Sequence, residues 1–276
     1  MLKIGEFNTL RILRKTSAGI FLGNGKGNDV LLPNRYVTPA MQVGESLTVF
    51  IYTDSEDRPV ATTEPPKVSV GHFAFLEIND AISAGAFADW GLSKDLFIPV
   101  NEQKHPLKKG DSAVVFVYLD DISNRVTGST RISEFLDNRD LPLQPNDAVD
   151  LMIYEKTDLG YNAIVNDFYK GLIYHNEIFK PIAIGTRTGG YIKKIREDLS
   201  IDLSLQPTGM QQLETSAADI LDYLKQHNGF LPLTDNSQPE AIYALMQMSK
   251  KSFKRGCGIL YKQKLIALKD DGIYLL

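Results

Sequence analysis

The sequence repeats itself at a constant offset of 66 residues, and no other feature limits the possible folds of the chain so strongly. Without a gap, Gly19–Phe21 aligns with Gly85–Phe87, and Phe50–Tyr52 aligns with Phe116–Tyr118. A third, weaker copy follows and ends with Ile201–Leu205. A fixed period of this kind indicates that one structural unit occurs several times in tandem.

Each copy has the pattern of a small β-barrel. The segments Ser46–Tyr52 and Ala113–Tyr118 are rich in β-branched and aromatic residues, which favour strands, and each runs into an acidic turn and a further strand. Gly19 and Gly85 lie inside predicted strands, where glycine allows the sharp bend with which a small sheet closes. A unit of about 65 residues with about five strands is typical of an OB-fold barrel.

The pattern becomes helical after Pro207. Apolar residues spaced three and four apart predict a first helix, which Asn228-Gly229 ends. These apolar residues are Leu213, Ala217, Ile220, Leu221 and Leu224. A capping box at Ser237–Glu240 predicts a second helix, and Ser249 to about Gln263 is predicted to form a third. Residues 265–276 are typical of a hairpin with a glycine turn, so the order of elements indicates a winged helix.

We therefore predict a mainly β chain with an α+β C-terminal domain. The expected domains are OB-fold (S1-like) barrels at 1–64, 65–140 and 141–208, and a winged helix at 209–276. Proline lies in the two connectors between the barrels, Glu64–Lys67 and Asp140–Pro145, and we interpret them as stiff linkers.

Composition narrows the class of protein. The net charge is −4, whereas chains that bind nucleic acid are usually basic. The charge is uneven, however, because residues 241–269 hold seven basic residues and no acidic one. Cys257 is the single cysteine and cannot form an internal disulfide, and the first residues lack the regions of a signal peptide, so we expect a cytoplasmic protein.

The sequence contains no recognisable catalytic, metal or cofactor motif. The four histidines, His72, His105, His175 and His227, have no companions at ligand spacing. The glycine-rich segment Gly23–Gly27 lacks the Gly-Lys-Ser/Thr ending of a phosphate loop. We expect a binding protein with no enzymatic activity, no cofactor and no metal.

Aromatic residues next to cations are the candidate contacts for single-stranded nucleic acid, because bases stack on rings while cations follow the phosphates. The candidates are Phe21, Lys26 and Arg35 in the first repeat, Phe87, Trp90 and Lys94 in the second, and Tyr161, Phe168, Tyr169, Lys170, Tyr174, His175, Tyr191, Lys193, Lys194 and Arg196 in the third. Alternation predicts that Tyr191, Lys193 and Ile195 share one face of a strand. The third repeat has the most aromatics beside cations, although any of these rings could instead fill a barrel interior.

The third predicted helix of the winged helix has a basic face. Lys251, Lys254, Arg255 and Lys262 lie opposite the apolar face of Phe253, Cys257 and Leu260. Such a face can contact phosphates or can simply be solvated. The lack of acidic residues around it favours contact.

Several motifs resemble those of known families. Gly91–Glu102 and Gly171–Ile178 resemble the S1-like RNA-binding repeat. Over nearly its full length the chain resembles the bacterial CvfB/YitL family, through Tyr52–Glu64, Tyr154–Tyr161, Gly190–Asp198 and Gly229–Asp235. The resemblance implies three S1-like barrels, a winged helix, RNA binding and a post-transcriptional role linked in some bacteria to virulence-gene expression.

The resemblance also bears on single positions. Phe21 and Phe87 match the exposed phenylalanine of the family's Gly-Ala-Phe strand, whereas the third repeat has Asn162 near that place. The family's binding histidine falls on Pro33, Pro99 and Tyr174. The resemblance therefore implies unequal binding by the three repeats.

The leading hypothesis is a single-stranded RNA-binding protein that regulates gene expression after transcription, with structured RNA or duplex DNA as further partners of the winged helix. Two alternatives stay open. One is a DNA-binding transcription regulator that acts through the winged helix, and the other is a protein-interaction scaffold whose barrels no longer bind nucleic acid.

Overall fold

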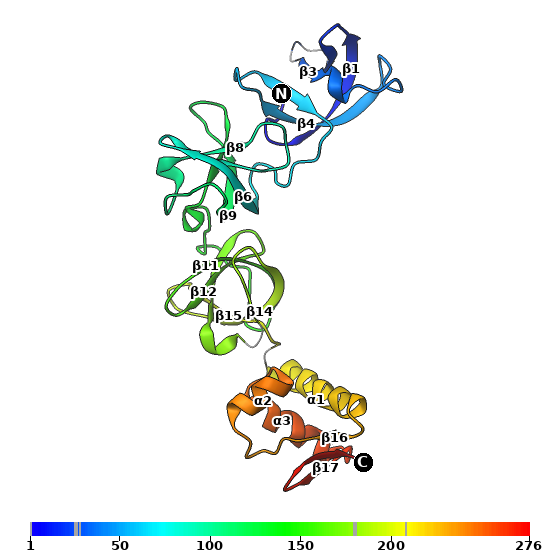
Figure 1. Ribbon diagram of the computed structural model, residues 1–276, viewed down its shortest axis with the longest axis vertical. Coiled ribbons are helices and arrows are strands. Elements are labelled where there is room, and N and C mark those ends of the chain that lie inside the picture. The colour runs from blue at the N-terminus through cyan, green and yellow to red at the C-terminus, as the bar shows by residue number, and fades with distance from the viewer. Residues whose placement is uncertain (1, 25–26, 28, 179–180, 208) are drawn as a thin grey trace. The chain divides into compact units, whose positions relative to one another are not determined.

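A computed structural model of the chain describes residues 2–24, 27, 29–178, 181–207 and 209–276 (Figure 1). Within these residues it contains three closed five-stranded barrels, followed by a helical region with a small three-stranded sheet. The predicted fold class is confirmed. Lys26 lies outside the described residues.

The three barrels share one topology. The first consists of β1 (Phe7–Lys15), β2 (Gly19–Gly23), β3 (Val30–Pro33), β4 (Ser46–Thr53) and β5 (Pro59–Thr62). The second consists of β6 (Phe73–Ile82), β7 (Gly85–Ala88), β8 (Leu96–Pro99), β9 (Ser112–Leu119) and β10 (Val126–Ser129). The third consists of β11 (Ala148–Lys156), β12 (Gly160–Val165), β13 (Tyr169–Tyr174), β14 (Arg187–Ile195) and β15 (Ile201–Ser204). In each barrel the closed order is first, second, third, fifth and fourth strand, with the third and fifth strands parallel.

Short 3-10 helices lie in the segments that follow strands of the barrels. They are η1 (Asn34–Tyr36), η2 (Val100–Glu102), η3 (Ile132–Glu134) and η4 (His175–Glu177). Three of them directly follow the third strand of a barrel, so the repeat extends to the connecting segments.

A glycine begins the second strand of every barrel because the third strand passes too close for a side chain. A Cβ atom would lie 2.1 Å from a backbone carbonyl oxygen at Gly19, 2.4 Å at Gly85 and 1.9 Å at Gly160. The sequence explanation for Gly19 and Gly85 was a bend in the strand. The structure shows a steric reason, the close approach of the neighbouring backbone.

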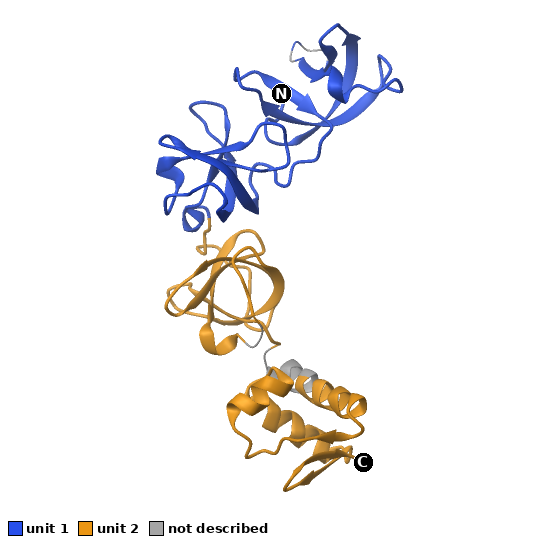
Figure 2. Ribbon diagram, in the orientation of Figure 1, with its two compact units in different colours: residues 1–135 blue, residues 136–276 orange. Residues whose placement is uncertain are grey.

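The first two barrels are docked on each other. Residues 1–135 form one compact unit and residues 136–276 a second (Figure 2). In the first unit, Phe50 and Tyr52 of β4 belong to the same buried cluster as the core of the second barrel. The ring of Trp90 packs edge-on against both, with centroids 5.8 Å from Phe50 and 6.3 Å from Tyr52. The connector Glu64–Lys67, interpreted above as a stiff linker, therefore joins two barrels that share a hydrophobic core.

The C-terminal region has the predicted order of elements. It comprises α1 (Gly209–Gln226), β16 (Phe230–Leu231), α2 (Pro239–Met246), α3 (Lys250–Lys262), β17 (Ile266–Lys269) and β18 (Gly272–Leu275). The predicted inward face of α3 is confirmed, since Phe253, Cys257 and Leu260 are buried. Burial raises the pKa of the Cys257 thiol to about 12, as expected for a core cysteine.

The two predicted helix starts have different outcomes. Ser249 caps α3, where its hydroxyl accepts a hydrogen bond from the Ser252 amide at 3.1 Å. The predicted capping box at α2 is wrong. Gln238 is the N-cap residue there and makes no side-chain capping bond, while the Ser237 hydroxyl accepts from the Thr234 amide at 2.9 Å. Among the described residues, no helix is long and apolar enough to cross a membrane.

Candidate nucleic-acid interface

The outer face of the second barrel carries a pair of phenylalanines. Strand pairing sets Phe87 of β7 opposite Phe97 of β8, and Phe97 opposite Thr127 of β10. The two rings are tilted with centroids 5.3 Å apart, and both are half-buried. Ile82, 53% exposed, lies in the strand before them. Side-by-side rings on an open strand face form a platform on which bases can stack.

The corresponding face of the first barrel has one aromatic residue. Phe21 of β2 lies opposite Leu31 of β3. The guanidinium carbon of Arg14 lies 4.1 Å from the centroid of the Phe21 ring, and Arg14 forms an ion pair with Asp29 at 2.6 Å. A single ring that already holds a cation on one side can stack one base at most.

Arg14 was not among the residues predicted from the sequence, although the hairpin contains a signal for it. The hairpin β1–β2 pairs Arg14 directly with Phe21, after a bulge between Ile12 and Arg14. Counting back from the turn places Lys15 opposite Ile20 and Arg14 opposite Phe21, because the bulge lies beyond Arg14 and leaves this end of the hairpin regular.

Arg35 does not lie beside Phe21 as the grouping of candidates implied. Its guanidinium lies over the ring of Tyr36, 4.6 Å from the centroid, and donates a hydrogen bond to the Ser93 hydroxyl of the second barrel at 2.7 Å. Arg35 therefore belongs to the seam between the first two barrels.

Trp90 and Lys94, candidates for RNA contact in the second repeat, also hold that seam together. Trp90 is only 2% exposed, so neither face of its ring can take a base, and its indole N–H donates to the Lys94 carbonyl at 2.6 Å. The Lys94 ammonium donates to the carbonyl oxygens of Thr53 at 3.0 Å and Asp54 at 2.7 Å. Burial lowers the pKa of this ammonium. Trp90 is thus excluded as a stacking platform.

The third barrel has no aromatic ring at the three corresponding positions. Strand pairing aligns Asn162 with Leu172 and Leu172 with Asp202. The side chains of Tyr161 and Tyr169 lie on the other side of their strands from Asn162 and Leu172, and they pack against the barrel core. The expectation that the third repeat has the richest binding face is therefore not met at these positions, because two of its tyrosines partly fill the interior.

The remaining aromatic candidates of the third barrel lie around its edges. Tyr174 is half-buried at the end of β13, and the ring of His175 lies edge-on to Tyr161 with centroids 6.1 Å apart. Phe168 is 68% exposed and packs at an angle against Tyr169. They form no side-by-side pair across two strands comparable to Phe87 and Phe97.

Several basic candidates of the third barrel are engaged with acidic or aromatic partners. Arg196 forms an ion pair with Asp202 at 3.0 Å and donates to the Tyr174 hydroxyl. The Asp202 carboxylate raises the pKa of the Arg196 guanidinium. Lys193 forms an ion pair with Glu177 at 2.5 Å. These acids compete with phosphates for the same cations.

The predicted alternation along Tyr191–Arg196 is wrong. The pairing of β14 with β15 shifts between Ile192 and Lys194, which marks a bulge. Ile192 and Ile195 consequently both pack on the core, while Lys193 and Lys194 are exposed. Tyr191 is half-buried and does not share a face with Ile195.

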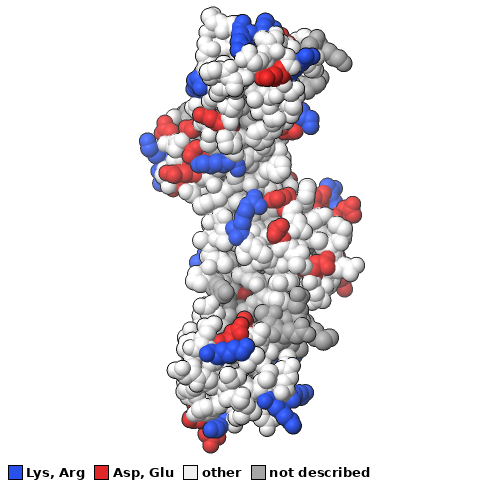
Figure 3. Space-filling model, turned by 90° about the vertical axis from the view of Figure 1, so that its right-hand side faces the viewer, with Lys and Arg blue, Asp and Glu red and all other residues white. Residues whose placement is uncertain are grey.

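Basic residues on α3 are exposed as predicted. Lys251, Lys254, Arg255 and Lys262 all reach solvent. Lys254 lies 3.8 Å from Asp235 in an ion pair, which offsets part of its charge. On the face seen in Figure 3, basic and acidic side chains are intermixed over the barrels and the winged helix.

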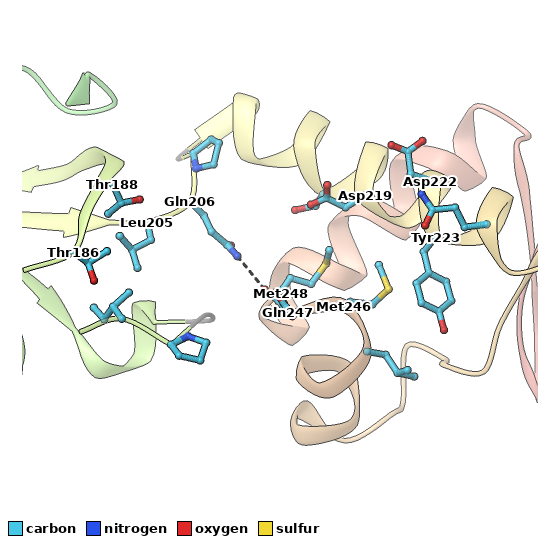
Figure 4. A pocket seen from close by; sticks show the side chains of 16 residues that line it. Thr186, Thr188, Leu205, Gln206, Asp219, Asp222, Tyr223, Met246, Gln247 and Met248 are labelled. Atoms are coloured by element: carbon cyan, nitrogen blue, oxygen red, sulfur yellow. Dashed lines mark hydrogen bonds between the residues drawn. The ribbon is translucent and has the colours of Figure 1, made fainter. Parts of the chain in front are cut away.

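A cavity of about 690 Å³ lies between the third barrel and the winged helix (Figure 4). Gln206 donates a hydrogen bond across it to the Gln247 carbonyl at 3.2 Å. The described residues that line it include Asp219 and Asp222 but no lysine or arginine. A cavity with this charge repels phosphates, so it is not a candidate RNA site.

Comparison with known families matches three of the four domains. The S1 domain model matches residues 4–64 and 70–131, and the CvfB-like winged helix domain model matches residues 218–275. The chain is 30% identical to the uncharacterized protein YitL of Bacillus subtilis, over 98% of this chain and 93% of that protein. It is 24% identical to conserved virulence factor B of Staphylococcus saprophyticus, over 99% of this chain and 94% of that protein.

Among solved structures, the chain is similar to a multidomain protein with nucleic acid binding domains from Streptococcus pneumoniae TIGR4. The identity is 24%, the TM-score is 0.44, and the match covers 99% of this chain and 98% of that chain.

Proposed function

Because this chain belongs to the CvfB/YitL family, whose S1 and winged helix domains are nucleic-acid-binding domains, we propose that it binds single-stranded RNA and thereby regulates gene expression after transcription. The observation that carries the proposal is the Phe87–Phe97 pair on the outer face of the second barrel.

A single strand fits this platform better than a duplex. Rings can stack only on bases whose faces are free, and bases in a duplex are already stacked on each other. Duplex binding without stacking relies on many phosphate contacts, which require a surplus of cations. Here the net charge is −4 and several cations of the barrels are paired with acids.

We propose binding rather than catalysis. Stacking on Phe87 and Phe97 holds a base without breaking a bond, and the proposed regulation follows from occupying an RNA segment that another factor would use. One relative is named conserved virulence factor B. A regulatory role for this chain is part of the proposal.

The test is fluorescence anisotropy of the full chain with a labelled RNA strand of about 12 nucleotides and a duplex DNA of the same length. Titrations at about 50 and about 200 mM salt report the number of phosphates contacted. We expect tighter binding to the RNA strand, and a loss of about 30-fold or more when Phe87→Ala and Phe97→Ala are combined, since each stacked base contributes about 1–3 kcal/mol.

A matched control is Phe75→Ala, which removes a phenylalanine that is 43% exposed on β6, outside the strands of the platform. The control variant should bind like the wild type. Equal affinity of the double variant and the control, both folded by circular dichroism, would refute the platform. Absence of RNA binding by the wild type at low salt would refute the proposed function and favour a protein-interaction scaffold.

A further inference from the structure

A cavity of about 380 Å³ lies at the seam between the first two barrels, next to the phenylalanine platform. The second barrel contributes Phe87, Phe97, Lys94 and Arg125 to its lining, and the first barrel contributes Tyr52 and Ser55. We propose that this cavity holds one nucleobase of a bound RNA strand, so that the first barrel completes a base site on the second. The proposal rests on the proposed function and identifies where the protein contacts an individual base of the strand.

The dimensions and the lining suit a single base. Ligand sites range from about 300 to about 1,000 Å³, so a volume of about 380 Å³ is at the small end. The aromatic part of the lining comes from Phe87, Phe97 and the nearly fully buried Trp90. A flat aromatic ligand of nucleobase size fits in such a site, whereas a longer segment of strand has to continue outside it.

Lys94 supplies a polar group inside the cavity. An ammonium group has three donors. Among the described residues, two of them are used for the carbonyl oxygens of Thr53 and Asp54. Those two bonds fix the position of the ammonium, and the third donor is left for an acceptor on a ligand, such as a carbonyl oxygen or ring nitrogen of a base.

The charges around the cavity favour a neutral ligand over a phosphate. Arg125 forms an ion pair with Asp57, and both residues line the cavity. Asp95 faces it as well, so the positive charges of Lys94 and Arg125 are balanced by two carboxylates. A phosphate group would gain little net attraction here, while the polar edge of a base can meet both donors and acceptors.

The cavity is formed before any ligand binds. Trp90, Phe50 and Tyr52 pack in one buried cluster, and the Tyr52 hydroxyl lies within hydrogen-bonding distance of the Ser93 hydroxyl, 3.2 Å away. Because the seam is already ordered, binding a base there does not cost the entropy of bringing two barrels together.

The test places a bulky side chain at the rim of the cavity on the first barrel. Ser55 is exposed in the turn between β4 and β5 and lines the cavity, so Ser55→Leu narrows the site without touching the platform. The matched control is Ser133→Leu, the same change at an exposed serine that does not line the cavity. We expect Ser55→Leu to weaken binding of the RNA strand about tenfold, and Ser133→Leu to bind like the wild type.

The only tryptophan of the chain provides a second, direct readout. Trp90 lines the cavity, so its emission should change when the RNA strand saturates the wild type and the Ser133→Leu variant. The change should be lost or much reduced in the Ser55→Leu variant at equal saturation.

The outcomes separate the two proposals. In one outcome, the double variant Phe87→Ala/Phe97→Ala binds RNA more weakly, but Ser55→Leu and Ser133→Leu bind RNA equally tightly and show the same change in Trp90 emission. The base site is then overturned and the proposed function stands. If RNA leaves Trp90 emission unchanged in the wild type although anisotropy shows binding, the base site is likewise overturned. If the folded wild type binds no RNA, both proposals fall.

Discussion

The second and third barrels have the same strand order but different outer faces. At three corresponding positions the second barrel has Phe87, Phe97 and Thr127, and the third has Asn162, Leu172 and Asp202. The barrel fold fixes which positions face outward, but it does not fix which residue types occupy them. The difference shows that repeating a fold does not repeat its binding surface, and that the residues at the outward positions decide what each copy can hold.

The two barrels also differ in how they are stabilised. The core of the second barrel continues into Phe50, Tyr52 and Val60 of the first. The buried cluster of the third barrel contains residues of that barrel alone. Stability and the proposed base binding are therefore coupled at the seam of the first two barrels, because residues that hold the seam also line the cavity there.

The largest effect expected from this comparison is on stability. Trp90→Ala should lower the free energy of unfolding of residues 1–135 by about 3–5 kcal/mol, because it removes a large buried ring from the shared core. Urea unfolding followed by circular dichroism measures this. As a control, Phe168→Ala removes a ring that is 68% exposed in the third barrel and should cost less than about 0.5 kcal/mol. A Trp90→Ala midpoint equal to that of the control would contradict the shared core.

A graft tests whether the outward positions are sufficient for binding. Asn162→Phe combined with Leu172→Phe gives the third barrel the pair present in the second, and we expect affinity for the RNA strand to rise about tenfold, equivalent to one more stacked base. Anisotropy titration measures it, with Asn162→Leu as a control that adds no ring. No gain in a folded graft would show that the seam cavity matters more than the rings.

A smaller effect separates two tyrosines, Tyr154 on β11 of the third barrel and Tyr52 on β4 of the first. The Tyr154 hydroxyl is buried and has no hydrogen-bond partner among the described residues, whereas Tyr52 has the Ser93 hydroxyl 3.2 Å away. Tyr154→Phe should therefore stabilise its barrel by about 1 kcal/mol, and Tyr52→Phe should destabilise the first unit by about 1 kcal/mol. Thermal and urea unfolding of both variants check the opposite signs, and equal signs would contradict the assigned contacts.

The smallest effect is expected in the winged helix. Lys251→Gln should weaken RNA binding by about twofold and lower the salt slope by less than one, because an exposed cation contributes at most one phosphate contact. Lys254→Gln should change the affinity less, because Asp235 already offsets part of the charge of Lys254. A large loss of duplex DNA binding in Lys251→Gln, with RNA binding unchanged, would instead favour a DNA-binding role for α3.

Much of the fold could be predicted because it depends on local patterns. The repeat offset, the β-branched strands and the change to helical spacing after Pro207 identified three barrels and a winged helix. The cap at Ser249 and the buried face of α3 were predictable for the same reason, since both depend on residues within one or two helical turns. The false capping box at Ser237 shows that such a motif does not ensure a capping hydrogen bond, because the Ser237 hydroxyl accepts from the Thr234 amide instead.

The candidate site was less predictable because it depends on register and on contacts between repeats. Phe87 was identified from the repeat itself, and its partner Phe97 follows from strand pairing. Trp90 was wrongly predicted to contact RNA because it lies in the loop between β7 and β8, where no periodic pattern in the sequence indicates burial. The bulge in β14 inverted the faces assigned around Lys193, since one extra residue exchanges the two sides of a strand.

The sequence by itself determined the number and type of the domains, because alternation and helical spacing follow from burying apolar side chains along each element. Only the tertiary structure decided that two of the barrels share one core and that Lys94 forms hydrogen bonds across the seam between them. It also decided that the outer face of the third barrel lacks a ring pair at the positions of Phe87 and Phe97. These features arise from distant segments meeting at fixed distances, and a linear pattern of residues contains no such distances.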